Sequence, residues 1–171
     1  MKLLKILSAA FLLQSVVATA FEGDSCDHRW WLNVGLGLGT TFNNEAAPIS
    51  STGAGQVSFN GMITENIFVE FARTFVVKGS DRGPEATDAG ILFGYKGKHP
   101  NWYWATSAGV SYYRYEKPYY YNFTVEKNGV GIPVEGQLFW KPFRHFGIGL
   151  IAHGLVSQDP YAVVLLGFQL S

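Results

Sequence analysis

Apolar residues recur at every second position along most of this sequence, and this period of two is the feature that most restricts the fold. From Trp30 to Gly39 the alternate positions are large and apolar, and most of the residues between them are glycine or asparagine. The runs from Phe146 to His153 and from Ala162 to Leu170 also place an apolar residue at every second position. Successive side chains of a β-strand point to opposite faces, whereas a helix repeats about every 3.6 residues. The pattern therefore predicts strands, each with one strongly apolar face.

The composition also favours strands over helices. The chain of 171 residues contains 20 glycines, and 16% of its residues are aromatic. Glycine costs ~1 kcal/mol relative to alanine inside a helix, whereas aromatic side chains fit the pleated surface of a sheet. After the first 20 residues, no uninterrupted apolar run is long enough to be a membrane helix.

Turn residues divide the chain into eight runs of strand length. Long connections at about 41–54, 77–87 and 116–128 alternate with short ones at 64–66, 97–101 and 141–145, and residues 157–160 form the last connection. This alternation is typical of a barrel whose long loops all leave from one end. We therefore predict an all-β fold, an eight-stranded antiparallel up-and-down transmembrane β-barrel.

One proline conflicts with a regular barrel. Six of the seven prolines fall in turns or loops, but Pro133 falls within the sixth run. A closed barrel has no edge strand that could accommodate the missing N–H of a proline. We therefore expect a bulge or a late start of this strand at Pro133, with an uncertain register before it.

Aromatic residues gather at both ends of the predicted strands. Two membrane–water interfaces favour such rings, because each ring keeps an apolar body in lipid and a polar edge at the headgroups. At the short-turn end the candidates are Trp30, Tyr95, Trp102, Trp104, Trp140 and Phe146. At the long-loop end they are Phe75, Tyr112 and Tyr115, followed by a tyrosine cluster at 119–121.

The first 20 residues have the features of a secretory signal peptide. Lys2 and Lys5 precede an apolar segment at 6–13, and residues 18–20, Ala-Thr-Ala, match the small-x-small pattern of a cleavage site. The apolar segment is too short to cross the ~30 Å of a bilayer core. We predict a signal peptide at 1–20, a short N-terminal segment at 21–29 and one barrel domain at 30–171.

The leader, the eight alternating runs and the two aromatic ends resemble the small outer-membrane β-barrels of Gram-negative bacteria, the OmpA-transmembrane and OmpX-like class. The resemblance covers the whole mature chain, but it is one of architecture without a matching family motif. It implies an outer-membrane location and contact with outer-membrane lipid and lipopolysaccharide. It also implies a non-enzymatic role in surface interaction, adhesion or envelope integrity. Such a role would be carried by exposed loops around 43–52, 78–85 and 116–127, where an extracellular partner could bind.

Several polar residues share the inward parity of their strands. They are Glu70, Glu135, Gln137, His153 and Gln169. The interior of an eight-stranded barrel is just wide enough to be filled by side chains, so we expect a polar packing network and no open pore. The alternative is a functional relay of buried carboxylates and a histidine.

A second reading of His153 is enzymatic, because some eight-stranded outer-membrane barrels modify lipid A. The PagL-type deacylases carry a His-x-Ser-Asn motif on a late strand, with a glutamate nearby. Here Leu155 occupies the position of the nucleophilic serine, and the first serine after His153 is Ser157. This spacing does not place a hydroxyl beside the imidazole as a serine hydrolase requires.

A third reading is a secreted soluble barrel of lipocalin type that carries an apolar ligand. The two barrels differ in which face of the strands lines the interior. In a soluble carrier, Leu32, Val34, Leu36 and Leu38 would point inward around a cavity. In a membrane barrel the same residues would face lipid.

Charge and cysteine content exclude other functions. Loss of Lys2 and Lys5 with the leader takes the formal charge from 0 to −2, which argues against nucleic-acid binding. Cys26 is the single cysteine and forms no internal disulfide. It stands with three further potential metal ligands, Asp24, Asp27 and His28, in an open segment beside the cleavage site. We therefore expect neither a metal nor another cofactor.

Two arginines share the outward parity near the long-loop ends of their strands. These are Arg73 and Arg114. Cations in this place can meet lipopolysaccharide phosphates, and the alternative is that both are solvated rim residues.

Overall fold

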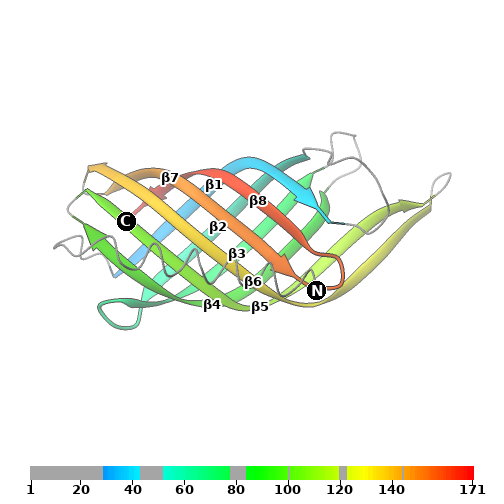
Figure 1. Ribbon diagram of the computed structural model, residues 1–171, viewed down its shortest axis with the longest axis horizontal. Coiled ribbons are helices and arrows are strands. Elements are labelled where there is room, and N and C mark those ends of the chain that lie inside the picture. The colour runs from blue at the N-terminus through cyan, green and yellow to red at the C-terminus, as the bar shows by residue number, and fades with distance from the viewer. Residues whose placement is uncertain (1–28, 43–51, 78–83, 100, 120–122, 144) are drawn as a thin grey trace.

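The chain folds into eight long β-strands. The computed structural model describes residues 29–42, 52–77, 84–99, 101–119, 123–143 and 145–171, and the other residues are drawn in grey in Figure 1. The strands are β1 (Trp30–Thr41), β2 (Thr52–Met62), β3 (Ile67–Val77), β4 (Pro84–His99), β5 (Trp102–Tyr119), β6 (Phe123–Phe143), β7 (Phe146–Val156) and β8 (Tyr161–Leu170). No helix among the described residues is long and apolar enough to cross a membrane.

Each strand pairs antiparallel with its neighbours in sequence, and β1 also pairs with β8, so that the sheet closes. Leu36 of β1, for example, lies opposite Gly55 of β2 on one side and Leu166 of β8 on the other. The strands run obliquely to the long axis of the barrel (Figure 1). The predicted eight-stranded antiparallel up-and-down barrel is confirmed.

The third long connection was predicted as a long loop with extended shoulders, and it is shorter than this. Residues 116–119 and 123–128 are not loop but continue β5 and β6, with Glu116 opposite Glu126 and Tyr119 opposite Phe123. Mutual pairing satisfies the backbone groups of both arms, and the aromatic and β-branched residues here suit a strand. The resulting hairpin reaches farther than any other strand at the long-loop end (Figure 1).

The bulge or late strand start expected at Pro133 is not found, although the ladder on one side is interrupted there. β6 runs through Pro133, which lies opposite Leu155 of β7. On the other side, the ladder to β5 leaves out residues 132 and 133 but keeps its register, since Ala108 pairs with Val134 and Ser111 with Gly131. A proline lacks only one donor, and the intact ladder on both sides of the gap holds the strand in place.

Two short turns are shorter than predicted. β4 continues to His99 and β6 to Phe143, so residues 97–99 and 141–143 belong to strands. Gly97 and His99 pair with Trp104 and Trp102 of β5. Glycine and proline in these segments suggested turns, but the cross-strand pairing of the barrel extends over them.

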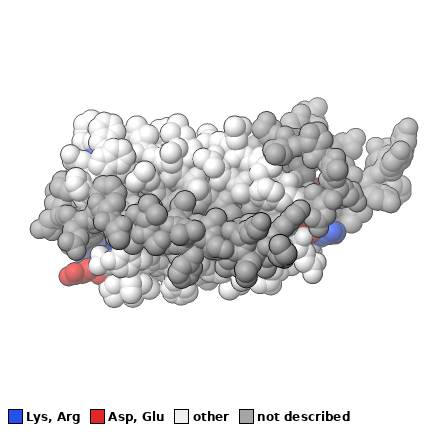
Figure 2. All heavy atoms as spheres, viewed as in Figure 1, with Lys and Arg blue, Asp and Glu red and all other residues white. Residues whose placement is uncertain are grey.

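The barrel is apolar outside and polar inside. Leu36, Leu38 and Val164 point outward and are exposed, whereas Asn33, Gln56 and Glu70 are buried in the interior. On the face shown in Figure 2, the described atoms visible in the middle are mostly those of residues other than Lys, Arg, Asp and Glu, and acidic and basic atoms are visible towards the ends. A soluble carrier needs the opposite arrangement, with Val34, Leu36 and Leu38 inside.

The height of the apolar belt matches a bilayer. The outward residues of β5 run from Trp102 to Tyr112 without a charged residue. Ten residue steps of ~3.3 Å on a strand tilted by about 40° give roughly 25 Å along the barrel axis. The apolar band of outer-membrane barrels is ~25 Å tall.

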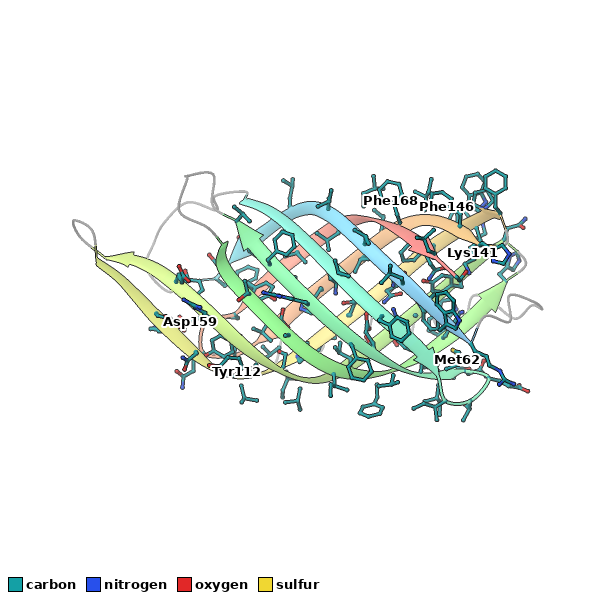
Figure 3. All side chains as sticks on the ribbon, turned by 180° about the vertical axis from the view of Figure 1, so that it is seen from behind. Met62, Tyr112, Lys141, Phe146, Asp159 and Phe168 are labelled. Atoms are coloured by element: carbon teal, nitrogen blue, oxygen red, sulfur yellow. The ribbon has the colours of Figure 1, made fainter. Side chains whose placement is uncertain are left out.

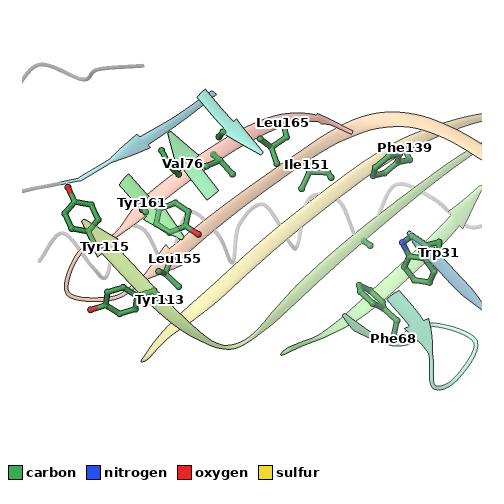
Figure 4. Packing of buried hydrophobic residues seen from close by; sticks show 14 of the residues in the cluster. Trp31, Phe68, Val76, Tyr113, Tyr115, Phe139, Ile151, Leu155, Tyr161 and Leu165 are labelled. Atoms are coloured by element: carbon green, nitrogen blue, oxygen red, sulfur yellow. The ribbon is translucent and has the colours of Figure 1, made fainter. Parts of the chain in front are cut away.

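The interior has apolar layers at its two ends. Trp31, Phe68 and Phe139 pack at the short-turn end, and Tyr113, Tyr115, Val76, Leu155 and Tyr161 pack at the long-loop end (Figure 4). Lys96 extends into the first layer, with its Nζ 4.3 Å from the Trp31 ring centre and 4.8 Å from that of Tyr103. The predicted polar residues lie between these layers.

Candidate functional site

Glu135 of β6 is the centre of the interior polar network. Its carboxylate accepts hydrogen bonds from Gln56 Nε2 at 2.5 Å and from Gln137 Nε2 at 2.7 Å, and His153 Nδ1 lies 3.0 Å from Oε2. Glu135 and His153 meet because they lie directly opposite each other in the ladder between β6 and β7. All four side chains are buried. The carboxylate therefore has protein donors on both oxygens.

Gln137 connects Glu135 to a second buried carboxylate. Its Nε2 also donates to Glu70 Oε1 at 3.2 Å, and Glu70 Oε2 accepts a bond from Ser107 Oγ at 2.8 Å. The Gln137 Oε1 accepts bonds from Asn33 Nδ2 at 3.1 Å and from Tyr103 OH at 3.2 Å. This one side chain thus joins strands β1, β3, β5 and β6.

Gln169 attaches β8 to the same network. Its Nε2 donates to Asn33 Oδ1 at 3.1 Å and to the Tyr103 hydroxyl. The structure therefore brings all five inward polar candidates into one connected set. It also adds Asn33, Gln56, Ser107 and Tyr103, which we did not select from the sequence although they have the inward parity of their strands.

Asp88 of β4 extends the network towards the long-loop end. The His153 Nε2 lies 3.6 Å from Asp88 Oδ1, and the Tyr161 hydroxyl donates to the same oxygen. The His153 imidazole therefore lies between two buried carboxylates. Asp88 shares its parity with the inward Leu92, and that signal could have identified it.

This arrangement brings two carboxylates and an imidazole together in the interior. His153 is buried in the interior, and its ring contacts Glu135, Asp88 and the Tyr161 ring. Leu155, at the position of the deacylase serine, is also buried inside. Within the described strands, no group of three or more His, Cys, Asp or Glu side chains could hold a metal ion. The cluster at Asp24 to His28 lies outside the described residues.

Aromatic side chains surround the outside of the short-turn end. Trp30, Tyr95, Trp102 and Trp140 are exposed, and Phe146 is half-buried. Neighbouring rings contact one another, as in the pair Trp102–Trp140, whose centres lie 6.4 Å apart. Figure 3 shows Phe146 and Phe168 at this end, and Tyr112 and Asp159 at the opposite end.

Trp104 belongs to the same exterior face but is covered by its neighbours. It lies opposite Gly97 in the ladder, and only 5% of it is exposed, because the Tyr95 ring packs against it at 5.7 Å between centres. The absence of a side chain on Gly97 leaves room for the indole. A Cβ atom there would lie 2.3 Å from Trp104 Cε2.

Among the described side chains, the long-loop end carries fewer outward rings than predicted. Tyr112 is exposed, and Phe75 is half-buried with its ring over Gly55. The assignment of Tyr115 to the membrane interface was wrong. It has the inward parity of Tyr113, is 3% exposed and packs in the interior layer (Figure 4). Residues 120 and 121 of the predicted tyrosine cluster lie outside the described residues.

Because Trp104 fits closely over Gly97, we expect a side chain at position 97 to destabilise the barrel. Replacing Gly97 with alanine should displace the indole and lower the free energy of unfolding by about 1–3 kcal/mol. Urea unfolding of the refolded protein, followed by tryptophan fluorescence, measures the change. Gly136→Ala is the matched control, because a Cβ at Gly136 meets no atom within 4 Å. Equal stability of the two variants would contradict the packing described here.

The closed eight-stranded barrel, with its apolar exterior and polar interior, has the fold of the small outer-membrane β-barrels, in agreement with the resemblance seen in the sequence. Comparisons with known proteins show this likeness at the level of the fold. No family model matches the sequence, and no curated protein matches it.

Three solved structures illustrate the similarity. Ail, the attachment invasion locus protein of Yersinia pestis, aligns with a TM-score of 0.64 at 7% identity, over 82% of this chain and 96% of Ail. Neisserial surface protein A aligns with a TM-score of 0.62 at 9% identity, over 87% and 99% of the two chains. The N-terminal β-barrel domain of Pseudomonas aeruginosa OprF aligns with a TM-score of 0.60 at 11% identity, over 83% and 98%. At these identities the likeness shows the fold.

Proposed function

We propose that this protein spans the bacterial outer membrane and acts at the cell surface through its long-loop end. Export would remove residues 1–20, and the belt of outward Leu, Val, Ile and Phe side chains would contact lipid. The aromatic residues at the short-turn end would lie at the periplasmic interface. The inverted distribution of side chains, apolar outside and polar inside, supports the membrane location.

The observation that carries the surface role is the projecting β5–β6 hairpin. Beyond the point where β4 and β7 end, its two arms pair only with each other. Arg114 near its base pairs with Glu116 at 3.0 Å and with Glu126 at 2.9 Å, and Lys127 Nζ lies 3.4 Å from Asp159 Oδ1. These ion pairs fix the hairpin at the rim, where it can present its tip to a partner. The interior is filled with hydrogen-bonded side chains, which supports a binding role over solute conduction.

The loops predicted to bind partners are only partly described. Residues 43–51, 78–83 and 120–122 lie outside the described residues. They connect strands at the same end as the hairpin, so they would form one surface with it. The function we propose for this surface is attachment to an extracellular partner or support of envelope integrity.

A sulfated glycan is one ligand class to test. The Ail protein of Yersinia pestis has been solved in complex with the heparin analogue sucrose octasulfate, and this complex aligns with a TM-score of 0.63. The described rim of the present chain is mixed in charge, with Arg114 and Lys127 already paired to carboxylates. A sulfated glycan that binds Arg114 and Lys127 would therefore have to compete with the carboxylates that already pair with them.

Shortening the hairpin tests the surface role. Replacing residues 117–125 with Asn-Gly would join Glu116 to Glu126 by a two-residue turn. The barrel should still assemble, and cells carrying the variant should lose attachment to heparin-coated or matrix-coated surfaces, or resistance to detergent. A replacement of equal length by glycine and serine is the matched control, because it keeps the reach of the hairpin and removes its side chains. Unchanged attachment and detergent resistance in the shortened variant would contradict the proposal.

A further inference from the structure

Arg73 is an exception on the lipid-facing surface. It points outward from β3 between Phe71 and Phe75, and it is exposed. Its ladder neighbours are Val57 of β2 and Ala89 of β4. Among the outward residues of the described strands between the two aromatic ends, Arg73 is the one charged side chain. A cation at the edge of the apolar belt can reach the headgroups, where anionic lipids offer it a partner.

The protein supplies no counter-charge to Arg73 in the described part of the chain. The described ion pairs of the rim involve Arg114 and Lys127, and Arg73 takes part in no hydrogen bond or ion pair with another described residue. A long arginine side chain can extend its guanidinium towards the headgroups while its stem stays in the apolar belt. No described side chain neutralises Arg73, and an anionic group from outside the chain can do so.

The surroundings of Arg73 leave space on one side. The ring of Phe75, the next outward residue of β3, lies over Gly55 of β2, where a Cβ atom would be 2.3 Å from its Cζ. The ring therefore leans away from β4. On the β4 side the outward neighbours are Ala89, opposite Arg73, and Thr87, one outward position closer to the rim. These small side chains form a strip that the guanidinium can cross.

Larger groups border this strip. Tyr112 of β5 lies opposite Ala89, and Arg114 lies opposite Thr87. Below the strip, Phe71, Ile91 and Val110 lie side by side on β3, β4 and β5, and all three are exposed apolar residues. At headgroup height the strip is thus bordered by the cation of Arg114 and the hydroxyl of Tyr112. At the height of the acyl chains it is bordered by the apolar row.

We propose that Arg73 binds the phosphate of an anionic membrane lipid whose headgroup lies over Thr87 and Ala89. This inference rests on the proposed membrane location. The guanidinium would donate two parallel hydrogen bonds to phosphate oxygens, and the Thr87 hydroxyl would donate a third. The acyl chains would lie on the row formed by Phe71, Ile91 and Val110. Arg114 is held by Glu116 and Glu126 and serves as the border of the site.

Native mass spectrometry of the refolded full chain, released from a maltoside detergent, tests the site. The probes are phosphatidylglycerol, lipid A and an uncharged diacyl glycolipid, each titrated separately. Arg73→Gln should bind the first phosphate-bearing lipid about tenfold more weakly than the wild type, and Arg73→Lys should be intermediate. Arg29→Gln removes the same charge at the opposite end of the barrel and should bind like the wild type. A larger effect with lipid A or with phosphatidylglycerol identifies the source of the phosphate, and either result supports the site.

Two results would overturn the site. One is equal binding of phosphate-bearing lipids by wild type and Arg73→Gln, and the other is equally tight binding of the uncharged glycolipid by the wild type. Recovery of the wild type in the outer-membrane fraction is measured first. Absence from that fraction contradicts the membrane location itself, whereas its presence together with unchanged binding by Arg73→Gln contradicts only the lipid site.

Discussion

Replacing Glu135 with leucine should lower the free energy of unfolding by about 3–5 kcal/mol. The substitution removes the acceptor of Gln56 and Gln137 and leaves His153 without its closest carboxylate. Buried donors without partners lose their interaction with water and gain nothing in return. Urea unfolding in lipid vesicles, followed by the mobility of the folded band on a gel, measures the loss.

Glu126→Leu on the same strand is the control for this prediction. Glu126 pairs with Arg114 on the exposed rim, and an exposed ion pair contributes about 0–1 kcal/mol. The double variant Glu135→Leu with His153→Leu should be less destabilised than the sum of the two single variants, because it removes both members of the buried pair. Additive effects would show that Glu135 and His153 do not stabilise each other, and equal stability of Glu135→Leu and Glu126→Leu would show that the interior network does not stabilise the barrel.

Replacing Leu36 with arginine should cost about 2–4 kcal/mol of stability in a bilayer. Leu36 is the seventh of the 12 residues of β1 and points outward with 62% of its surface exposed. Val130→Arg is the control, since Val130 is 69% exposed but lies opposite Tyr112 near the long-loop end. A charge near the interface costs about 0–1 kcal/mol, because it can reach the headgroups.

The same pair of variants separates a membrane barrel from a soluble one. If this exterior faced water, an arginine at either exposed position would leave the stability almost unchanged. The variants are compared by urea unfolding in lipid vesicles and by the amount of folded protein in cell envelopes. Normal assembly and stability of Leu36→Arg would show that Leu36 does not face lipid.

The period of two predicted the strands and most of their faces correctly. The outward orientation of Leu36, Leu150 and Leu166 follows from the local sequence, because alternation depends only on neighbouring residues. The assignment of Tyr115 to the membrane interface failed because it rested on the place of this residue near the rim, whereas the parity of Tyr115 is inward, as the structure shows. The prediction of a loop failed at residues 116–119 and 123–128, where local turn signals were overridden by pairing between the two arms of a hairpin.

Contacts across the interior could not be predicted in the same way. The pairing of Glu135 with His153 depends on the register between β6 and β7, which includes an irregularity between Trp140 and Phe143. The bond from Gln56 to Glu135 joins residues 79 positions apart, and it requires the closure and stagger of the whole barrel. Likewise, parity placed Arg73 and Arg114 on the same face, but only the structure shows that Arg114 has carboxylate partners.

Cell fractionation combined with gel electrophoresis of unheated and boiled samples tests the membrane-barrel assignment most directly. A closed barrel with a hydrogen-bonded interior should be recovered in the outer-membrane fraction. It should also migrate differently before and after boiling, because the folded barrel resists detergent until it is heated. Recovery in the periplasm or the medium, with the same mobility in both samples, would contradict a membrane barrel.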